Sequence, residues 1–333
     1  MACLRDVRGG FWLALSVPAI ALSSFVCDRP WIFVLMVVVA IPLFDALIGR
    51  TERVGGAPLA EVSAGIPVMF ICMWGMTLLV AVARASTAHL ANWAGLALGT
   101  GALSAFAMAH AHEAMHRHSR VSRAFADVTF VLAGYPHYQM AHHLHHAHVG
   151  DARFGSTAPA GVSVWRHVVP SFLTALRSAT AAEEQRVSHA LQNRVITRSI
   201  VWGAALVAFS LYGGWKSGAL FATQGVVSAF VVEVIGYIQH YGLSTEVSAE
   251  HVAWEVDYWL SNRLLVNNGL HEHHHLKATT PYNQLRARGA SLPGGYLHMF
   301  CLALIPPMWF AMMGPKLATK RPLVQKYLVD KTK

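Results

Sequence analysis

Histidines are concentrated in two stretches of this 333-residue chain, and residues 109–148 alone contain ten of the 20. Three groups have the spacings HxxxH, HxxHH and HxxHH, in this order: His112 and His116; His142, His145 and His146; His271, His274 and His275. Imidazoles spaced i, i+3, i+4 lie on one face of a helix, so each group can direct two or three ring nitrogens toward a common centre. These eight ligands predict a site for more than one metal ion.

The residue types in and around the three histidine groups do not identify the metal. Neutral imidazole binds iron, zinc and copper alike. The nearby carboxyl groups of Glu113, Asp151 and Glu272 either orient the rings or are solvated loop residues. The four cysteines form no CxxC pair and stand far apart, at Cys3, Cys27, Cys72 and Cys301. This excludes a zinc ribbon, a rubredoxin-type site and a disulfide framework, so an electron carrier would be a separate protein.

The remaining histidines do not fit the spacing. Six lie beside the groups, and we expect hydrogen-bonding or surface roles for most of them: His110, His118, His137, His143, His148 and His273. Five others are isolated, and a structural role is the simpler interpretation: His89, His167, His189, His251 and His298.

The composition indicates the medium in which these groups are positioned. The chain is 54% hydrophobic and 13% charged with a positive mean hydropathy, whereas a soluble domain carries about 25% charged residues. The net charge of +9 comes from scattered Lys and Arg. No basic stripe with interleaved aromatic residues exists, so a nucleic-acid partner is not expected. The chain therefore belongs to the membrane class, with the lipid bilayer as its surroundings.

Apolar runs predict an all-α integral membrane protein with about six transmembrane helices, because a bilayer requires about 20 apolar residues per crossing. The predicted spans are residues 11–27, 31–49, 66–85, 89–110, 199–212 and 219–240. We expect Val162–Leu176 to be an interfacial helix. Because Pro306-Pro307 interrupts residues 296–313, this segment is predicted to be re-entrant or interfacial. Trp31, Trp74 and Trp93 are candidate cavity residues, although packing or interface anchoring is the commoner role.

The positive-inside rule predicts the orientation. It places both termini and the loop Arg50–Ala64 in the cytoplasm, which puts the first histidine group at the cytoplasmic end of the fourth span. His240 then returns to the same side. We predict one domain over residues 1–333, in a bacterial inner membrane, with a histidine-rich di-metal cap on the cytoplasmic side.

A specific resemblance appears at Gly236–Leu243, which is similar to the NYxEHYG signature of the membrane-bound alkane and xylene monooxygenases within the fatty acid desaturase-like superfamily. Gly236 and Gln239 stand where that signature has Asn and Glu. Further matching stretches span about Pro42 to Pro315: Pro42–Asp45 with Gly49, Trp254–Asn262 with Asn267, Leu292–Tyr296 (LPxGY) and Leu304–Trp309 (LxPPLW). Ordinary membrane desaturases have the three histidine groups without the Gly236–Leu243 signature.

The resemblance implies a monooxygenase with two non-haem irons and O2 as co-substrate. It implies hydroxylation of an unactivated C–H bond, at a terminal or benzylic methyl group of an alkane, alkyl-aromatic or terpene, with electrons from rubredoxin or a ferredoxin and its reductase. The implied iron ligands are His112, His116, His142, His145, His146, His240, His271, His274 and His275. The implied supporting residues are Glu113, Gln239, Asp257, Asn262 and Glu272. Since the second group is one residue tighter than the family's EHxxxHH form, His143 is an alternative to His142.

Three other functions remain open. A fatty-acyl desaturase or hydroxylase would have the same architecture. A zinc-dependent membrane hydrolase needs only about three histidines and a water. A metal transporter would need ionisable residues along a path through the membrane, where the predicted spans offer little besides Asp45 and Glu233.

Overall fold

The structure of the chain is a computed structural model that describes residues 10–51, 65–243 and 252–318, and most of these residues are helical. The helices of the first half are η2 (Phe11–Leu15), α1 (Ser16–Val26), α2 (Pro30–Leu35), the π-helical η3 (Met36–Ala40), α3 (Ile41–Ile48), α4 (Ile66–Ala85), α5 (Leu90–Met115), α6 (Arg120–Leu132), α7 (Tyr138–Ala147) and η5 (Ala152–Phe154). The elements of the second half are α8 (Val164–Arg186), η6 (Ala190–Gln192), α9 (Arg194–His240), β1 (Trp254–Glu255), α10 (Trp259–Leu264), α11 (His271–Leu276), η7 (Tyr282–Gln284), β2 (Ala290–Ser291), α12 (Tyr296–Ala303) and α13 (Pro306–Ala318).

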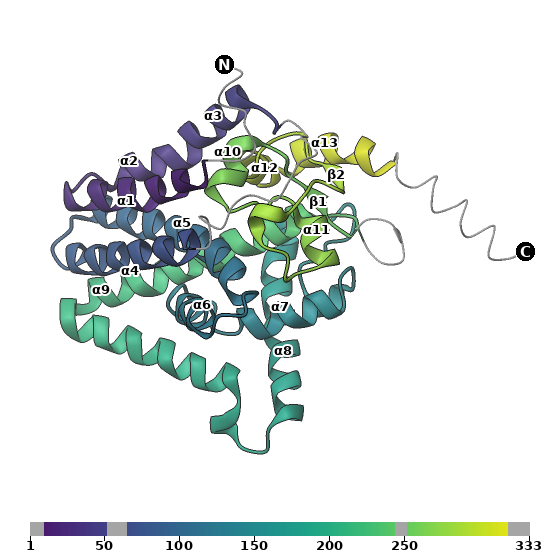
Figure 1. Cartoon of the computed structure of the whole chain (residues 1–333). Helices are drawn as coiled ribbons and strands as arrows, with labels where there is room; N and C mark the ends of the chain where they lie inside the picture. Colours follow the sequence, from purple (N-terminus) through teal and green to yellow (C-terminus); the bar gives the residue numbers. More distant parts are fainter. Residues whose placement is uncertain (1–9, 52–64, 244–251, 319–333) are drawn as a thin grey trace, which may run out of the picture.

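Among the described residues, four helical segments are long and apolar enough to cross a membrane: Pro30–Ile48, α4, α5 and α9. The bent pair of α12 and α13 would be a fifth if it formed one span. In Figure 1, α1, α2, α4, α5 and one arm of α9 lie side by side as a bundle. The most apolar window of α5 is 78% buried, against 22% for Pro30–Ile48. Helix α5 is therefore the centre of the bundle and Pro30–Ile48 lies at its edge.

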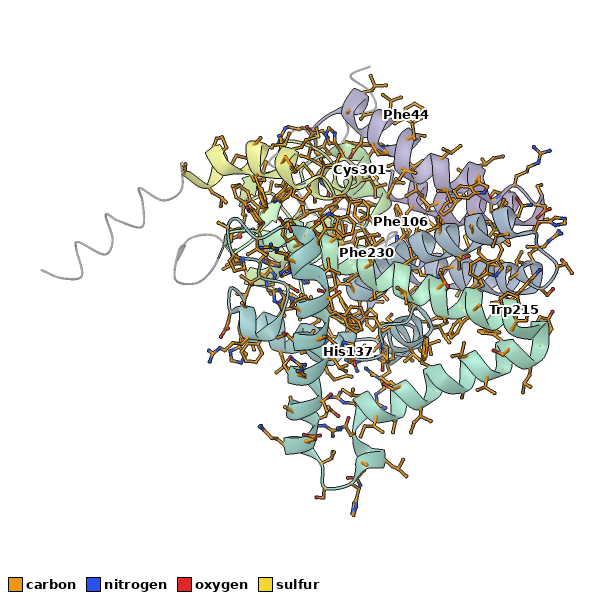
Figure 2. All side chains as sticks on the ribbon, turned by 180° about the vertical axis from the view of Figure 1, so that it is seen from behind. Phe44, Phe106, His137, Trp215, Phe230 and Cys301 are labelled. Carbon is orange, nitrogen blue, oxygen red and sulfur yellow. The ribbon has the colours of Figure 1, made fainter. Side chains whose placement is uncertain are left out.

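The outer surface of the bundle is apolar, as a lipid environment requires. On α3, the side chains of Phe44 and Leu47 are 54% and 69% exposed, and Figure 2 shows Phe44 pointing away from the molecule. Contiguous apolar surface of this kind is unfavourable in water and favourable in a hydrocarbon core. The predicted fold class is thus confirmed: the chain is an all-α membrane protein.

The described helices differ in number from the six predicted spans. The first predicted span is the 16-residue segment Phe11–Val26, which is shorter than a full crossing. The predicted spans 199–212 and 219–240 are two arms of α9, which meet where Gly213 has φ −124° and Gly214 has φ +72°. Glycine adopts this positive φ without steric cost. Figure 1 shows the chain reversing direction here, with Trp215 at the outer tip in Figure 2.

The two interrupted segments follow their sequence patterns. Helices α12 and α13 meet at an angle of 117°, at the break next to Pro306 that the sequence indicates. The predicted helix Val162–Leu176 corresponds to the first part of α8, which begins at Val164 and continues to Arg186. The termini and residues 52–64, which the charge rule places in the cytoplasm, lie outside the described residues.

The elements after α9 form a cap on one end of the bundle. Strands β1 and β2 pair in parallel, with Trp254 opposite Ala290. Buried Asp45 on α3 ties this cap to the bundle, because its carboxylate accepts hydrogen bonds from the backbone N–H and the hydroxyl of Ser261 on α10. One of the two acidic residues in the predicted spans therefore has a structural partner.

A close backbone contact holds the turn between α6 and α7 against α9. A Cβ added at Gly134, which has φ +85°, would lie 2.4 Å from the Cα of Gly225. Two glycines thus allow the turn between α6 and α7 to touch the second arm of α9 (Figure 1). This contact sets the distance between the helix that carries the second histidine group and the helix that ends at His240.

Candidate metal centre

Four helix segments from distant parts of the chain present their histidines to one region. The end of α5 carries His112, with His116 as its C-cap, and α7 carries the second group. The short helix α11 carries the third group, and α9 ends on His240. Each group occupies one face of its helix, as its spacing predicts.

In space, all nine predicted ligands converge in two clusters, which we call the five-histidine group and the four-histidine group. Within each group, one ring nitrogen per histidine lies within 4.8 Å of the others. The five-histidine group consists of His112, His116, His142, His146 and His274, and the four-histidine group consists of His145, His240, His271 and His275.

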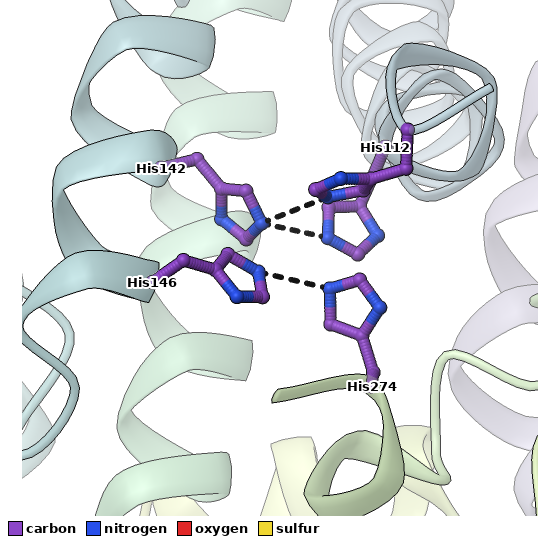
Figure 3. Close-up of side chains that lie close together, drawn as sticks. His112, His142, His146 and His274 are labelled. Atoms are coloured by element: carbon purple, nitrogen blue, oxygen red, sulfur yellow. Dashed lines mark hydrogen bonds between the residues drawn. The ribbon is translucent and has the colours of Figure 1, made fainter. Parts of the chain in front are cut away.

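Ring nitrogens face one another in both groups. His142 Nε2 lies 2.9 Å from His112 Nε2 and 3.4 Å from His116 Nε2. His146 Nε2 lies 3.0 Å from His274 Nε2, and Figure 3 shows these side chains pointing into the same space. In the four-histidine group, His275 Nε2 lies 3.1 Å from His271 Nε2. The second histidine group therefore contributes to both clusters.

The protonation state of these rings suits metal binding. Burial, and then the proximity of other imidazoles, lowers the pKa values of His142, His145, His271, His274 and His275 well below their ordinary range. The rings are therefore neutral near pH 7, as metal coordination requires. Neutral ring nitrogens that converge in a buried site can donate their lone pairs to a divalent cation. Without a cation, these buried nitrogens have few hydrogen-bond partners.

The metal-free protein is expected to lose stability as the pH falls from about 6.5 to about 4. Burial and His143 lower the pKa of His116 to about 4, and burial and His116 lower the pKa of His146 to about 3. In the unfolded chain both values are near 6.5. Over this interval the unfolded chain binds more protons than the folded protein does. The free energy of unfolding therefore falls as the pH is lowered, and the contribution of these rings is present in full above about pH 6.5.

Thermal unfolding midpoints of metal-free protein, measured from about pH 8 to about pH 5, check this expectation. The double variant His116→Ala/His146→Ala should have a shallower pH dependence than the wild type. Equal slopes for the two proteins would show that these rings titrate normally in the fold.

His240 is oriented by a backbone carbonyl. Its Nδ1 lies 2.8 Å from the oxygen of Val252, which leaves Nε2 as the nitrogen available to the four-histidine group. The carboxylate of buried Glu272 accepts hydrogen bonds from the N–H groups of Val252 and Ala253, at 3.0 and 2.9 Å. Glu272 therefore positions His240 through the segment that both contact.

Glu272→Ala is expected to weaken metal retention about 10–100-fold, as the loss of an outer partner typically does. The substitution leaves two backbone N–H groups unpaired and frees the carbonyl that orients His240. Metal content after a timed chelator challenge measures the effect, with Glu184→Ala on the exposed face of α8 as the control. Equal retention by the two variants would contradict a positioning role for Glu272.

The other predicted supporting residues brace the backbone around the site. Glu113 pairs with Arg117 and accepts the N–H of Tyr282. Gln239 Nε2 donates a hydrogen bond to the Tyr296 hydroxyl, and Asn262 Nδ2 donates one to the Val256 carbonyl. The carboxylate of Asp257 pairs with Arg50 and accepts a hydrogen bond from the Ser291 hydroxyl. Asp151 is paired with Arg153. Of these contacts, those of Glu113 and Gln239 attach the ligand-bearing helices α5 and α9 to the cap, and those of Asp257 and Asn262 lie within the cap or join it to the end of α3.

The eleven histidines that were not predicted as ligands are not members of either group where the structure describes them. His143, the alternative to His142, is exposed and belongs to neither group, although its ring centroid lies 6.3 Å from that of His116. His110 is stacked on Phe70 with a ring-centroid distance of 3.9 Å, and the Nδ1 of His273 accepts the N–H of Arg286. His137 and His167 are buried, whereas the exposed ones are His89, His118, His148, His189 and His298. His251 lies outside the described residues.

A cavity of about 110 Å³ opens beside the histidines and extends into the bundle. Its walls include ligand rings, among them His112 and His240, together with apolar side chains such as Phe106, Met108 and Val232. The apolar wall has no distinct sequence pattern, because α5 is apolar on nearly every face. Trp31, Trp74 and Trp93 do not line the cavity; their indole N–H groups donate to Ala91, Ser104 and Lys216, respectively.

Two polar residues of the cavity wall carried only partial sequence signals. Glu233 stood out as an ionisable residue in an apolar run, whereas Tyr135 had no recognisable motif. The Tyr135 hydroxyl donates a hydrogen bond to Glu233 Oε1. The ring of Tyr138, which also lines the cavity, stacks on His142 with a centroid distance of 5.4 Å.

Comparison with known proteins connects this site to a family. The family described as fatty acid desaturase matches residues 87–303, more than half of the chain. Alkane 1-monooxygenase 1 of Pseudomonas aeruginosa is 28% identical, over 95% of this chain and 92% of that protein. Alkane 1-monooxygenase 2 of the same organism is 26% identical, over 94% and 93%. The xylene/toluene monooxygenase hydroxylase component of Pseudomonas putida is 26% identical, over 62% of this chain and 59% of that protein.

The matched region runs from the start of α5 to the end of α12 and contains all nine converging histidines. The relatives belong to the same two groups of enzymes that the resemblance at Gly236–Leu243 indicates. The chain therefore belongs to the fatty acid desaturase family and is a membrane monooxygenase related to the alkane and xylene monooxygenases.

Proposed function

We propose that this protein hydroxylates an unactivated C–H bond of a hydrophobic molecule, at a terminal or benzylic methyl group of an alkane, alkyl-aromatic or terpene. The observation that carries the proposal is the juxtaposition of two histidine clusters with an apolar cavity inside a membrane bundle. The nine clustered histidines are the proposed ligands of two non-haem iron ions, one for each cluster.

The reaction consumes one O2, two electrons and two protons for each C–H bond, and it yields an alcohol and water. The iron ions supply, when bound, the redox chemistry that reduces O2. The neutral imidazoles hold these ions, and the apolar walls orient the substrate and limit the access of water. Since the chain has no cysteine-rich site of its own, the electrons come from a rubredoxin or from a ferredoxin with its reductase.

Residues 1–333 are proposed to form one domain in the bacterial inner membrane, with the histidine clusters on the cytoplasmic side. This orientation follows from the distribution of Lys and Arg and allows a soluble electron carrier to reach the cap. A substrate dissolved in the lipid would enter the cavity from between the helices.

A fatty-acyl desaturase or hydroxylase is the second candidate, because the matching family is described as fatty acid desaturase. Both candidates use the same ligands and cofactors and differ in their products. A zinc hydrolase would leave most of the nine histidines without a role. The structural contacts of Asp45 with Ser261 and of Glu233 with Tyr135 weaken the case for a metal transport path.

The decisive experiment measures metal content and oxidation-state spectra on anaerobically purified protein, with His240→Ala prepared in parallel. The expected result is about two irons per chain that react with O2, with less iron in the variant. One tightly held zinc that is indifferent to the substitution would overturn the proposal. Products from a panel of alkanes, alkyl-aromatics and acyl lipids then separate hydroxylation of hydrocarbons from acyl desaturation.

A further inference from the structure

We infer that Glu233 and Tyr135 form a polar recognition site in the substrate cavity, and that this site binds a hydroxyl group on the substrate at the end away from the reacting methyl group. The preferred substrate would then be an aliphatic alcohol rather than a plain hydrocarbon. This inference rests on the proposed hydroxylase function and specifies its substrate class.

The position of Glu233 suits recognition at a distance from the metal ligands. Glu233 precedes His240 by seven residues on α9, so the two side chains lie on the same face of the helix, two turns apart. At 1.5 Å per residue this separation is roughly 10 Å along the axis. Both side chains line the same cavity. A molecule of about this length could place its methyl group at the histidines and its other end at Glu233.

The carboxyl group of Glu233 has unused hydrogen-bonding capacity. The residue is only 6% exposed, and its Oε1 accepts the hydroxyl of Tyr135. Its Oε2 is buried and makes no hydrogen bond of standard geometry with the described residues; the Ser171 hydroxyl is close enough to interact with this carboxyl group and leaves part of its accepting capacity free. Leaving such an oxygen unpaired is costly in a protein interior. A ligand group in the cavity would remove this cost.

A hydroxyl group is the partner that fits this oxygen in either protonation state. A protonated Oε2 donates a hydrogen bond, and an ionised Oε2 accepts one; an alcohol can satisfy both. An ether or ketone could only accept, and an ammonium group could only donate. Among the described residues that line the cavity, none is Lys or Arg. A carboxylate, as in a free fatty acid, would therefore meet no counter-charge and a carboxyl group of the protein.

Tyr135 holds the carboxyl group in place. It is 2% exposed, and its ring packs against Phe172 and Tyr138 at centroid distances of 5.0 and 5.2 Å. Because Tyr135 lies in the turn before α7, the site combines this turn with the second arm of α9. Tyr135 is thus a positioning residue for Glu233.

The test compares n-alkanes of six to ten carbons with the primary alcohols of the same length. Affinities are measured by displacement of a fluorescent lipid analogue from metal-free protein in nanodiscs, so iron loading does not affect the result. The ratio of alkane to alcohol affinity in each variant, divided by that ratio in the wild type, removes the difference in water solubility.

We expect the preference for the alcohol over the alkane to be about tenfold greater in the wild type than in the double variant Glu233→Leu/Tyr135→Phe. One hydrogen bond to a buried group contributes a difference in affinity of about this size. Glu233→Gln, which retains a donor and an acceptor, should keep most of the preference. The apolar control Val232→Ala should weaken both ligands alike. An unchanged ratio in the double variant would overturn the inference and would indicate that water alone satisfies Oε2.

Turnover of the iron-loaded protein separates this inference from the proposed function. Products with hydroxyl groups at both ends, formed at a higher kcat/KM than the products of the matching alkanes, agree with both. Equal turnover of alkanes and alcohols would refute the polar recognition site and leave the hydroxylase function intact. Iron-loaded protein that oxidises neither class, with its electron donor present, would count against the proposed function itself.

Discussion

His142→Ala is expected to remove bound iron and hydroxylase activity, whereas His143→Ala is expected to leave both close to their wild-type values. The two residues are neighbours in the sequence, but the ring of His142 lies within 3.4 Å of both His112 and His116, and His143 is exposed. Loss of a direct ligand should reduce activity by at least the 10–100-fold that loss of a supporting partner costs.

Iron content per chain and product formation from one hydrocarbon substrate measure both effects on the same preparations. Because both substitutions remove an imidazole from α7, their helix propensity and their change in composition are matched. A loss of iron in His143→Ala with little effect in His142→Ala would show that His143 is the ligand in place of His142, with α7 rotated relative to the structure described above.

Gly134→Ala is expected to destabilise the protein by about 2–5 kcal/mol, from the cost of a positive φ and of overpacking. Gly134 has φ +85°, and a new Cβ would meet the Cα of Gly225 at 2.4 Å and its carbonyl carbon at 2.9 Å. Backbone atoms cannot move aside as a flexible side chain can. The turn before α7 would have to shift away from α9, and the second histidine group would move with it.

The thermal unfolding midpoint in detergent and the iron content measure the two consequences. The matched control is Gly203→Ala on α9, where no atom lies within 4 Å of the added Cβ and helix propensity favours alanine. Gly134→Ala should lower the midpoint and the iron content, and Gly203→Ala should leave both unchanged or slightly raised. If the two variants behave alike, the contact between the turn and α9 does not position the site.

Much of the architecture follows from the sequence because its causes are local. Helix length and apolar composition predict membrane segments, since one crossing needs a nearly fixed number of residues. The spacing of His271, His274 and His275 places three rings on one helical face, since the helix repeat is the same in every fold. The break at Pro306 is local for the same reason, because proline lacks the N–H that a helix interior requires.

Other features of the site depend on residues that are distant in the sequence. The departure from the family's spacing left His142 and His143 as alternatives, and only the tertiary position of α7, which packs against α8, brings the ring of His142 to His112. The division of the nine histidines into groups of five and four is likewise a property of four segments in three dimensions. The spacing within one helix specifies a face, but the neighbour of that face is set by tertiary packing.

The number of long helices and the polar end of the cavity show the same limit. The sequence indicates the reversal at Gly213 and Gly214 and the return of His240, but only the fold shows that the two arms form α9 and that α9 packs against α5. Glu233 and Tyr135 are 98 positions apart and meet because Gly134, next to Tyr135, touches Gly225 on α9. Hydrogen bonds and close contacts of this kind join residues without any common sequence period, so they are decided when the helices pack.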